Sequence, residues 1–116
     1  MIKETIYTQK LHAGAKFPSL QVMSLRDEKI QLGKPRNDAD WQLVIVYRGR
    51  HCPLCTKYLN ELARFKEDCL SIGVDIVAVS GDSKVQLEQH LDQLTINFEI
   101  AYGLSIEQMK HLGLYI

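Results

Sequence analysis

The sequence has little of what marks several large classes of protein. Its 116 residues carry 14 basic and 14 acidic side chains, so bulk charge gives no reason to expect a nucleic-acid or membrane-surface partner. No apolar run approaches the roughly 20 residues that a membrane-spanning helix needs. The length fits one compact unit. We therefore expect a single domain over residues 1–116, with neither nucleic acid nor membrane among its partners.

Cysteine is also scarce, with three residues in the whole chain. The segment Met1-Ile2-Lys3-Glu4-Thr5 lacks the apolar core of a signal peptide, which favours a cytoplasmic protein. Permanent disulfide frameworks are not expected in that reducing compartment. Thiol chemistry or metal binding is then the better expectation for the cysteines.

The N-terminal part of the chain shows two short alternating apolar pieces. They lie at residues 20–22 and 30–32, with the charged residues 26–29 between them. This pattern predicts a β-hairpin. Residues 33–40 are rich in turn formers and predict a loop.

A strand, a helix and a second strand are predicted next. Residues 43–47 form a continuous apolar run that suits a strand buried on both faces, with Trp41 before it as a packing residue. Apolar residues then recur at steps of four, four, three and four, as on one face of a helix; they are Leu54, Tyr58, Leu62, Phe65 and Cys69. Gly73 ends this helix, and residues 74–79 predict a second buried strand. The order predicts a βαβ unit with parallel strands.

Two capping boxes predict two further helices. Ser83 with Gln86 opens one that presents Leu87, Leu91 and Leu94 on one face, and Ser105 with Gln108 opens a short one. The chain then stops at residues 114–116, an apolar end with no polar tail. We interpret the domain as C-terminally incomplete; the alternative is that this tail docks against the core or a second subunit.

The most informative segment is residues 47–55, Tyr-Arg-Gly-Arg-His-Cys-Pro-Leu-Cys, directly after the first buried strand. Pro53 suits the first position of a helix, which makes Cys52 the N-cap and Cys55 the third helical residue. An N-cap side chain accepts a hydrogen bond from the N–H of that third residue. Both sulfurs then lie at the positive end of the helix dipole, which favours thiolate. We predict Cys52 and Cys55 as the catalytic residues.

Basic residues surround this pair in sequence. Arg48, Arg50 and His51 are predicted to stabilise a thiolate or to orient a substrate. The alternative is that they are ordinary solvated surface charges. Asp82 and Ser83 are interpreted as helix-capping residues without a chemical role.

The sequence argues against a disulfide from the third cysteine to Cys55 and against a metal site. Cys69 follows Cys55 by 14 positions in the same predicted helix, which places it about 21 Å away, far beyond the reach of a disulfide. Its place on the apolar stripe predicts a buried core thiol. A zinc site normally needs a second pair of ligands at suitable spacing, which the sequence lacks, so we expect no metal.

Taken together, these segments resemble the peroxiredoxin-like proteins of the AhpC/TSA family (alkyl hydroperoxide reductase/thiol-specific antioxidant). The resemblance runs from about Gly14 to Ile116 and covers the N-terminal part of such a domain. It implies an α/β thioredoxin-like fold, with a central mixed sheet, a βαβ unit flanked by helices and an N-terminal hairpin. In the family motif Pro-x-x-x-Thr-x-x-Cys the final cysteine attacks peroxide. Here Cys55 matches that cysteine, Cys52 stands at the threonine and Arg48 at the proline.

The segment is similar to a second template, the Cys-x-x-Cys motif of thioredoxins and glutaredoxins. There the first cysteine is the nucleophile, which matches Cys52, and Pro53 follows it as in glutaredoxin-like motifs. His51 stands where thioredoxins have tryptophan. The other two prolines, at positions 18 and 35, both precede the pair, so the cis-proline loop of thioredoxins has no match.

The resemblance implies a thiol-dependent oxidoreductase without a cofactor. The first expectation is a peroxiredoxin-like antioxidant that reduces peroxides through a Cys52–Cys55 thiol–disulfide cycle, with an external thiol as reductant. The alternatives are a protein disulfide reductase, with Cys52 attacking as the exposed N-cap residue, and a non-catalytic module that binds a partner. An exposed sheet edge would also favour a homodimer.

Overall fold

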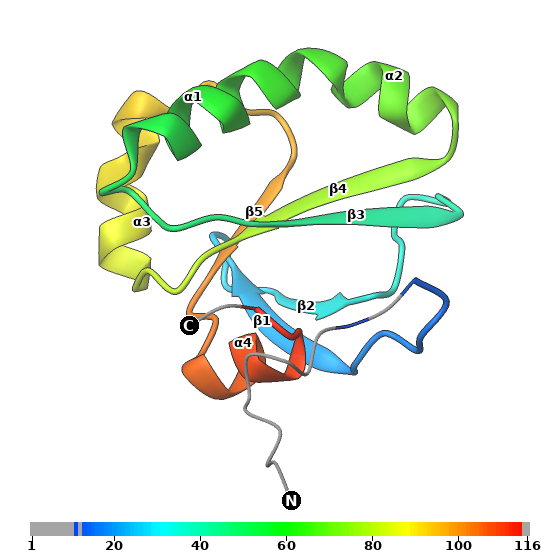
Figure 1. Ribbon diagram of the computed structural model, residues 1–116. Coiled ribbons are helices and arrows are strands. Elements are labelled where there is room, and N and C mark those ends of the chain that lie inside the picture. The colour runs from blue at the N-terminus through cyan, green and yellow to red at the C-terminus, as the bar shows by residue number, and fades with distance from the viewer. Residues whose placement is uncertain (1–10, 12, 115–116) are drawn as a thin grey trace, which may run out of the picture.

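The computed structural model describes residues 11 and 13–114, and these form a mixed five-stranded sheet with helices on both faces (Figure 1). The strand order is β2-β1-β5-β4-β3. β1 (Leu20–Ser24) and β2 (Lys29–Leu32) pair antiparallel and confirm the predicted hairpin. Two stretches discussed above, Met1 to Thr5 and the pair Tyr115 and Ile116, lie outside the described residues.

The predicted βαβ unit is confirmed. β3 (Trp41–Val46) and β4 (Val74–Val79) run parallel and side by side, with Trp41 opposite Val74. Between them run α1 (Pro53–Leu62), the 3-10 turn η2 (Ala63–Phe65) and α2 (Lys66–Ser71), which cover one face of the sheet (Figure 1). Gly73 adopts φ 81° directly after this helical stretch, a conformation that glycine takes without strain.

The prediction that the strand at residues 43–47 is buried on both faces is wrong. Within the described part of the chain β3 is an edge strand, bonded to β4 alone. Trp41 is 70% exposed and Leu43 is 38% exposed, so Trp41 is not a packing residue either. An apolar run shows that a segment is strand-like, but the order of strands in the sheet decides whether both of its faces are covered.

The predicted buried face of α1 is also wrong. Leu59 and Ala63 are buried, whereas Leu54, Tyr58 and Phe65 are 78%, 58% and 53% exposed. Large apolar side chains lie on more than one side of this helix, and the spacing alone does not say which side meets the sheet. Cys69 is half-buried rather than a fully buried core thiol.

After β4 the chain forms α3 (Lys84–His90), the turn η3 (Leu91–Gln93), β5 (Glu99–Tyr102) and α4 (Ile106–His111). Both predicted capping boxes form, at Ser83 with Gln86 and at Ser105 with Gln108. One apolar cluster joins the hairpin and the segment around α4 to one face of the sheet, and a second joins α1 and α3 to the other. No helix in the described part of the chain is long and apolar enough to cross a membrane.

Candidate active site

The two cysteines occupy the start of α1, where β3 ends. Cys52 is the N-cap residue with extended backbone angles, and Pro53 is the first helical residue. The Cys55 N–H donates to the Cys52 sulfur at 3.4 Å, as the spacing predicts. The carbonyl of Cys52 in turn accepts from the Thr56 N–H at 3.2 Å. The first turn of the helix therefore fixes the Cys52 sulfur against the backbone of Cys55.

The two thiols differ in exposure, in the opposite sense to the prediction. Cys52 is only 9% exposed, so it is not an exposed N-cap residue. Cys55 is half-buried and lines a shallow groove of about 270 Å³ between β3 and α1, which also takes in Tyr47, Leu54 and Tyr58. The Cys52 N–H donates to the Gly49 carbonyl at 3.2 Å, so the loop makes a tight turn directly before the helix.

The local electrostatics separate the two thiols further. The Cys55 side chain, followed by the Cys55 N–H, lowers the pKa of Cys52. The positive charge of Arg48 lowers the pKa of Cys52 as well. Burial, and then the Cys52 side chain, raises the pKa of Cys55. These surroundings favour the thiolate at Cys52 over a thiolate at Cys55.

The loop that carries the basic residues is held by a buried carboxylate. Asp82 is 7% exposed, and its Oδ2 accepts from the Arg50 N–H at 2.9 Å. Gly49 has φ 123°, and a Cβ there would lie 2.5 Å from Asp82 Oδ1. Asp82 thus shapes the loop before Cys52, a role that reading it as a helix cap missed. Its position three residues after the end of β4 was the signal, because the carboxyl ends of neighbouring parallel strands meet at one edge.

The three basic side chains of the loop are all exposed. Arg48 is the one whose charge acts on both cysteine pKa values. Arg50 contributes its backbone N–H to Asp82, and its charge lowers the pKa of His90. His51 lies in the turn next to Cys52.

A layer of buried polar side chains lies behind the thiols, and sequence reasoning did not find it. Thr56 Oγ1 is 2.7 Å from His90 Nε2, and His90 is 1% exposed. Tyr47 is 7% exposed, with its ring centre 6.2 Å from that of His90. Burial lowers the pKa of His90 and raises the pKa of Tyr47 to about 12, so both side chains are neutral near pH 7. No group of three or more potential metal ligands gathers anywhere in residues 11 and 13–114.

The family of the chain follows from comparison with known proteins. Residues 13–116 match the model of the AhpC/TSA family. The chain belongs to the AhpC/TSA family. The resemblance stated from the cysteine segment is thereby confirmed at the family level.

Solved structures resemble this AhpC/TSA chain in fold. A peroxiredoxin-like protein from Aquifex aeolicus is 23% identical with a TM-score of 0.62, over 83% of this chain and 54% of that one. The peroxidoxin BcpB from Mycobacterium tuberculosis is 11% identical with a TM-score of 0.73, over 85% and 64%. The thioredoxin domain of a thiol-disulfide oxidoreductase from Bacteroides vulgatus is 14% identical with a TM-score of 0.76, over 92% and 77%.

These likenesses confirm the predicted thioredoxin-like α/β fold. The AhpC/TSA chain spans about half to two-thirds of the length of the first two of these structures. No curated protein matches the sequence.

Proposed function

We propose that this chain is a thiol oxidoreductase in which Cys52 is the nucleophile and Cys55 the resolving thiol. The observation that carries the proposal is the hydrogen bond from the Cys55 N–H to the Cys52 sulfur, which stabilises negative charge at Cys52. The Cys55 side chain and this N–H lower the pKa of Cys52, whereas burial raises the pKa of Cys55. Family membership supports thiol chemistry at this segment.

Disulfide exchange is the reaction that this asymmetry favours. The Cys52 thiolate attacks one sulfur of a disulfide R–S–S–R′, forming a Cys52–S–S–R bond and releasing R′–S⁻. Cys55 then loses its proton to solvent and attacks the Cys52 sulfur. This closes a Cys52–Cys55 disulfide and releases R–S⁻. Two equivalents of an external thiol regenerate the dithiol form and are themselves oxidised to a disulfide.

Peroxide reduction is the second candidate, and the family match favours it. In this reaction a cysteine thiolate attacks a peroxide oxygen, becomes a sulfenic acid and releases an alcohol or water. The other cysteine attacks the sulfenic sulfur and water leaves, which gives the same disulfide. The family pattern assigns the attack to Cys55, whereas the electrostatics of the site favour Cys52.

Separate serine variants test the assignment of roles. Cys55→Ser is expected to accumulate a stable mixed disulfide at Cys52 when mixed with an aromatic disulfide, because no resolving thiol remains. Cys52→Ser is expected to react slowly, since its remaining thiol at position 55 has a raised pKa. Cys69→Ser is the matched control and should behave as the parent chain. Fast trapping by Cys52→Ser would instead make Cys55 the nucleophile.

The choice between the two reactions needs a direct comparison of oxidants. The loss of each thiol is followed by mass spectrometry while hydrogen peroxide or oxidised glutathione is titrated near pH 7. Faster loss with oxidised glutathione supports disulfide exchange, and faster loss with hydrogen peroxide supports the peroxidase. Loss no faster than that of free cysteine with both oxidants contradicts either enzyme and leaves a non-catalytic binding module.

A further inference from the structure

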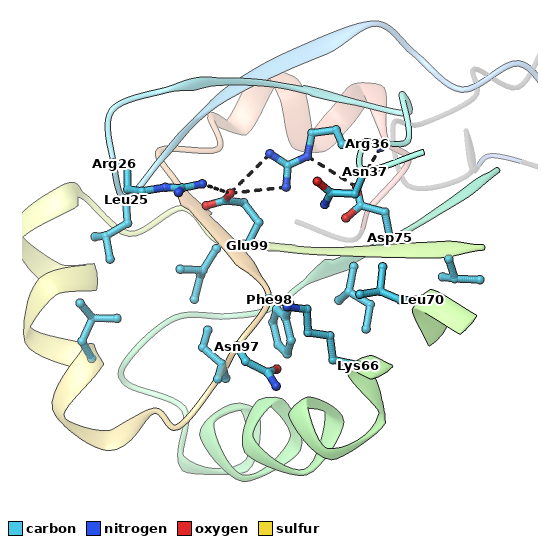
Figure 2. A pocket seen from close by; sticks show the side chains of 15 residues that line it. Leu25, Arg26, Arg36, Asn37, Lys66, Leu70, Asp75, Asn97, Phe98 and Glu99 are labelled. Carbon is cyan, nitrogen blue, oxygen red and sulfur yellow. Dashed lines mark hydrogen bonds and ion pairs between the residues drawn. The ribbon is translucent and has the colours of Figure 1, made fainter. Parts of the chain in front are cut away.

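A second cavity lies away from the thiols. Its volume is about 460 Å³, within the usual range for small-molecule sites, and it lies between α2, the first residues of β4 and β5, and the turn after β1 (Figure 2). The cysteines follow the carboxyl end of β3, whereas the cavity borders the amino end of β4, which runs parallel to β3 over six residues. The strand length places the two sites roughly 20 Å apart. The cavity is therefore separate from the thiol chemistry.

One side of this cavity is apolar. Side chains from α2, from β4 and β5 and from the segment before β5 line it: Leu70, Ile76, Ile96, Phe98 and Ile100. Phe98 stands near the centre of this lining in the close view (Figure 2). Such a surface suits a small aliphatic or aromatic group, and burying that group would contribute binding energy in proportion to its apolar area.

The opposite side carries an arginine whose hydrogen bonds are weak. Arg36 Nη1 and Nη2 both lie 3.4 Å from Glu99 Oε1, and Arg36 Nε lies 3.6 Å from Asp75 Oδ2 (Figure 2). Charge-assisted bonds of arginine are normally about 2.7–2.9 Å long. The same Glu99 oxygen already accepts from Arg26 at 2.8 Å. Arg36 Nε is buried and faces Asp75 without a hydrogen bond, so the guanidinium is held by Asp75 and Glu99.

The ion pairs around the cavity leave one cation of its lining out. The lining holds three cations, Arg26, Arg36 and Lys66, and two carboxylates, Asp75 and Glu99. Both carboxylates pair with the arginines, and Arg26 also pairs with Glu28 at 3.3 Å. Lys66 forms no ion pair with any residue that the structure describes, and it lines the cavity together with Phe98 and Asn97 (Figure 2). A lysine without a described partner therefore borders an apolar cavity.

We propose that this cavity binds a small amphipathic monoanion, a carboxylate joined to an apolar chain or ring. The apolar part packs on Phe98 and its neighbours, while the carboxylate pairs with Lys66. A dianion would bring the second charge against Asp75 and Glu99, which favours a single carboxylate. The proposal is independent of the function assigned to the cysteines.

The test uses hexanoate and its uncharged counterpart 1-hexanol with the parent chain. Each is titrated against ¹⁵N-labelled protein, and amide shifts are followed by NMR. Hexanoate is expected to shift the amides of residues 36, 66 and 97–100 saturably, while those of residues 52–55 stay in place. 1-Hexanol should bind about tenfold more weakly, because it lacks the charge that Lys66 attracts.

A charge-removing variant completes the test. Lys66→Gln is expected to weaken hexanoate binding about tenfold and to leave 1-hexanol binding unchanged. Lys57→Gln, which removes an exposed lysine of α1 outside the cavity, should change neither. The proposal is overturned if hexanoate gives no saturable shifts at these residues, or if 1-hexanol binds as tightly as hexanoate. The comparison of hexanoate with 1-hexanol uses the parent chain alone, so it tests the proposal even if Lys66→Gln does not fold.

Discussion

At the scale of single residues, two chemically identical thiols differ because of their surroundings. The Cys55 side chain, followed by the Cys55 N–H, lowers the pKa of Cys52, while burial raises that of Cys55. The N–H acts through its hydrogen bond of 3.4 Å to the Cys52 sulfur. Replacing the side chain at position 55 should therefore change the pKa of Cys52 and leave this backbone bond in place.

Cys55→Ala is expected to raise the pKa of Cys52, because it removes the side chain that lowers this pKa most and keeps the N–H donor. The measurement is the rate of alkylation of position 52 by iodoacetamide against pH, in a Cys69→Ser background. The midpoint of the profile should move to higher pH in the alanine variant. Cys55→Ser keeps a polar O–H group and should lie between the two. An unchanged midpoint in the alanine variant would show that the Cys55 side chain does not set the pKa of Cys52.

His90 gives a second prediction, on stability against pH. Burial lowers its pKa in the folded chain below the ordinary value of 6.5, so in the window between the two values the unfolded chain binds more protons. Stability is then lost as the pH falls below about 6.5, with a slope of at most about 1.4 kcal/mol per pH unit from this group. Urea unfolding of the parent at pH 7.5 and 5.5 should show the loss.

The matched variants for this prediction are His90→Gln and His111→Gln. Glutamine at position 90 cannot titrate, so the loss of stability between pH 7.5 and 5.5 should shrink. His111 is exposed near the end of the chain, and its replacement should leave the loss as it is. Equal losses in all three chains would rule out His90 as the source.

At the scale of elements, the loop between β3 and α1 depends on a contact with the end of β4. Gly49 has φ 123° and sits where a Cβ would meet the Asp82 carboxylate, the same carboxylate that accepts from the Arg50 N–H. The loop therefore needs both the backbone freedom and the small size of glycine. Any side chain at position 49 would push the loop away from Asp82 and shift the N-cap of α1.

Gly49→Ala is expected to destabilise the chain by about 2–4 kcal/mol, since the strained φ and the overpacking both contribute. Gly103→Ala is the matched control, because Gly103 also has a positive φ, 75°, but has no atom within 4 Å of its Cβ position. It should cost about 1–2 kcal/mol for the backbone strain alone. Chemical unfolding measures the free energy of unfolding of both variants. An equal loss of stability in the two would mean that the contact with Asp82 is unimportant.

What could be predicted from the sequence also depends on the element. The two capping boxes and the N-cap role of Cys52 were predictable, because each rests on residues three apart in the chain. The edge position of β3 was not predictable, because it depends on whether a further strand pairs with its other side in the sheet. The buried side of α1 and the role of Asp82 were missed for the same reason. Each is set by a contact between segments that are distant in sequence.

At the scale of the whole molecule, β3 presents an unprotected edge. Its six residues include no proline, lysine or other charged residue, and Trp41 and Leu43 on it are exposed. Natural edge strands usually carry such residues to prevent pairing with another chain. The same side of the molecule exposes Leu54 and Tyr58 around the groove at Cys55.

We therefore expect the chain to self-associate with rising concentration, and Trp41→Lys to reduce that association. Sedimentation velocity over a hundredfold range of concentration, on the order of micromolar upward, measures it. Ile106→Lys replaces another exposed apolar residue, 54% exposed in α4 and not part of β3, and should leave association unchanged. A chain that sediments as a monomer throughout would contradict this expectation.

The edge position of β3 also bears on how the molecule moves. A strand with one bonded neighbour loses half of the ladder that holds an interior strand such as β4 in place. In hydrogen–deuterium exchange, the amides of β3 should therefore take up deuterium earlier than those of β4. The two thiols follow the end of this less protected strand, so we expect the segment proposed to carry the chemistry to open while the rest of the sheet stays closed.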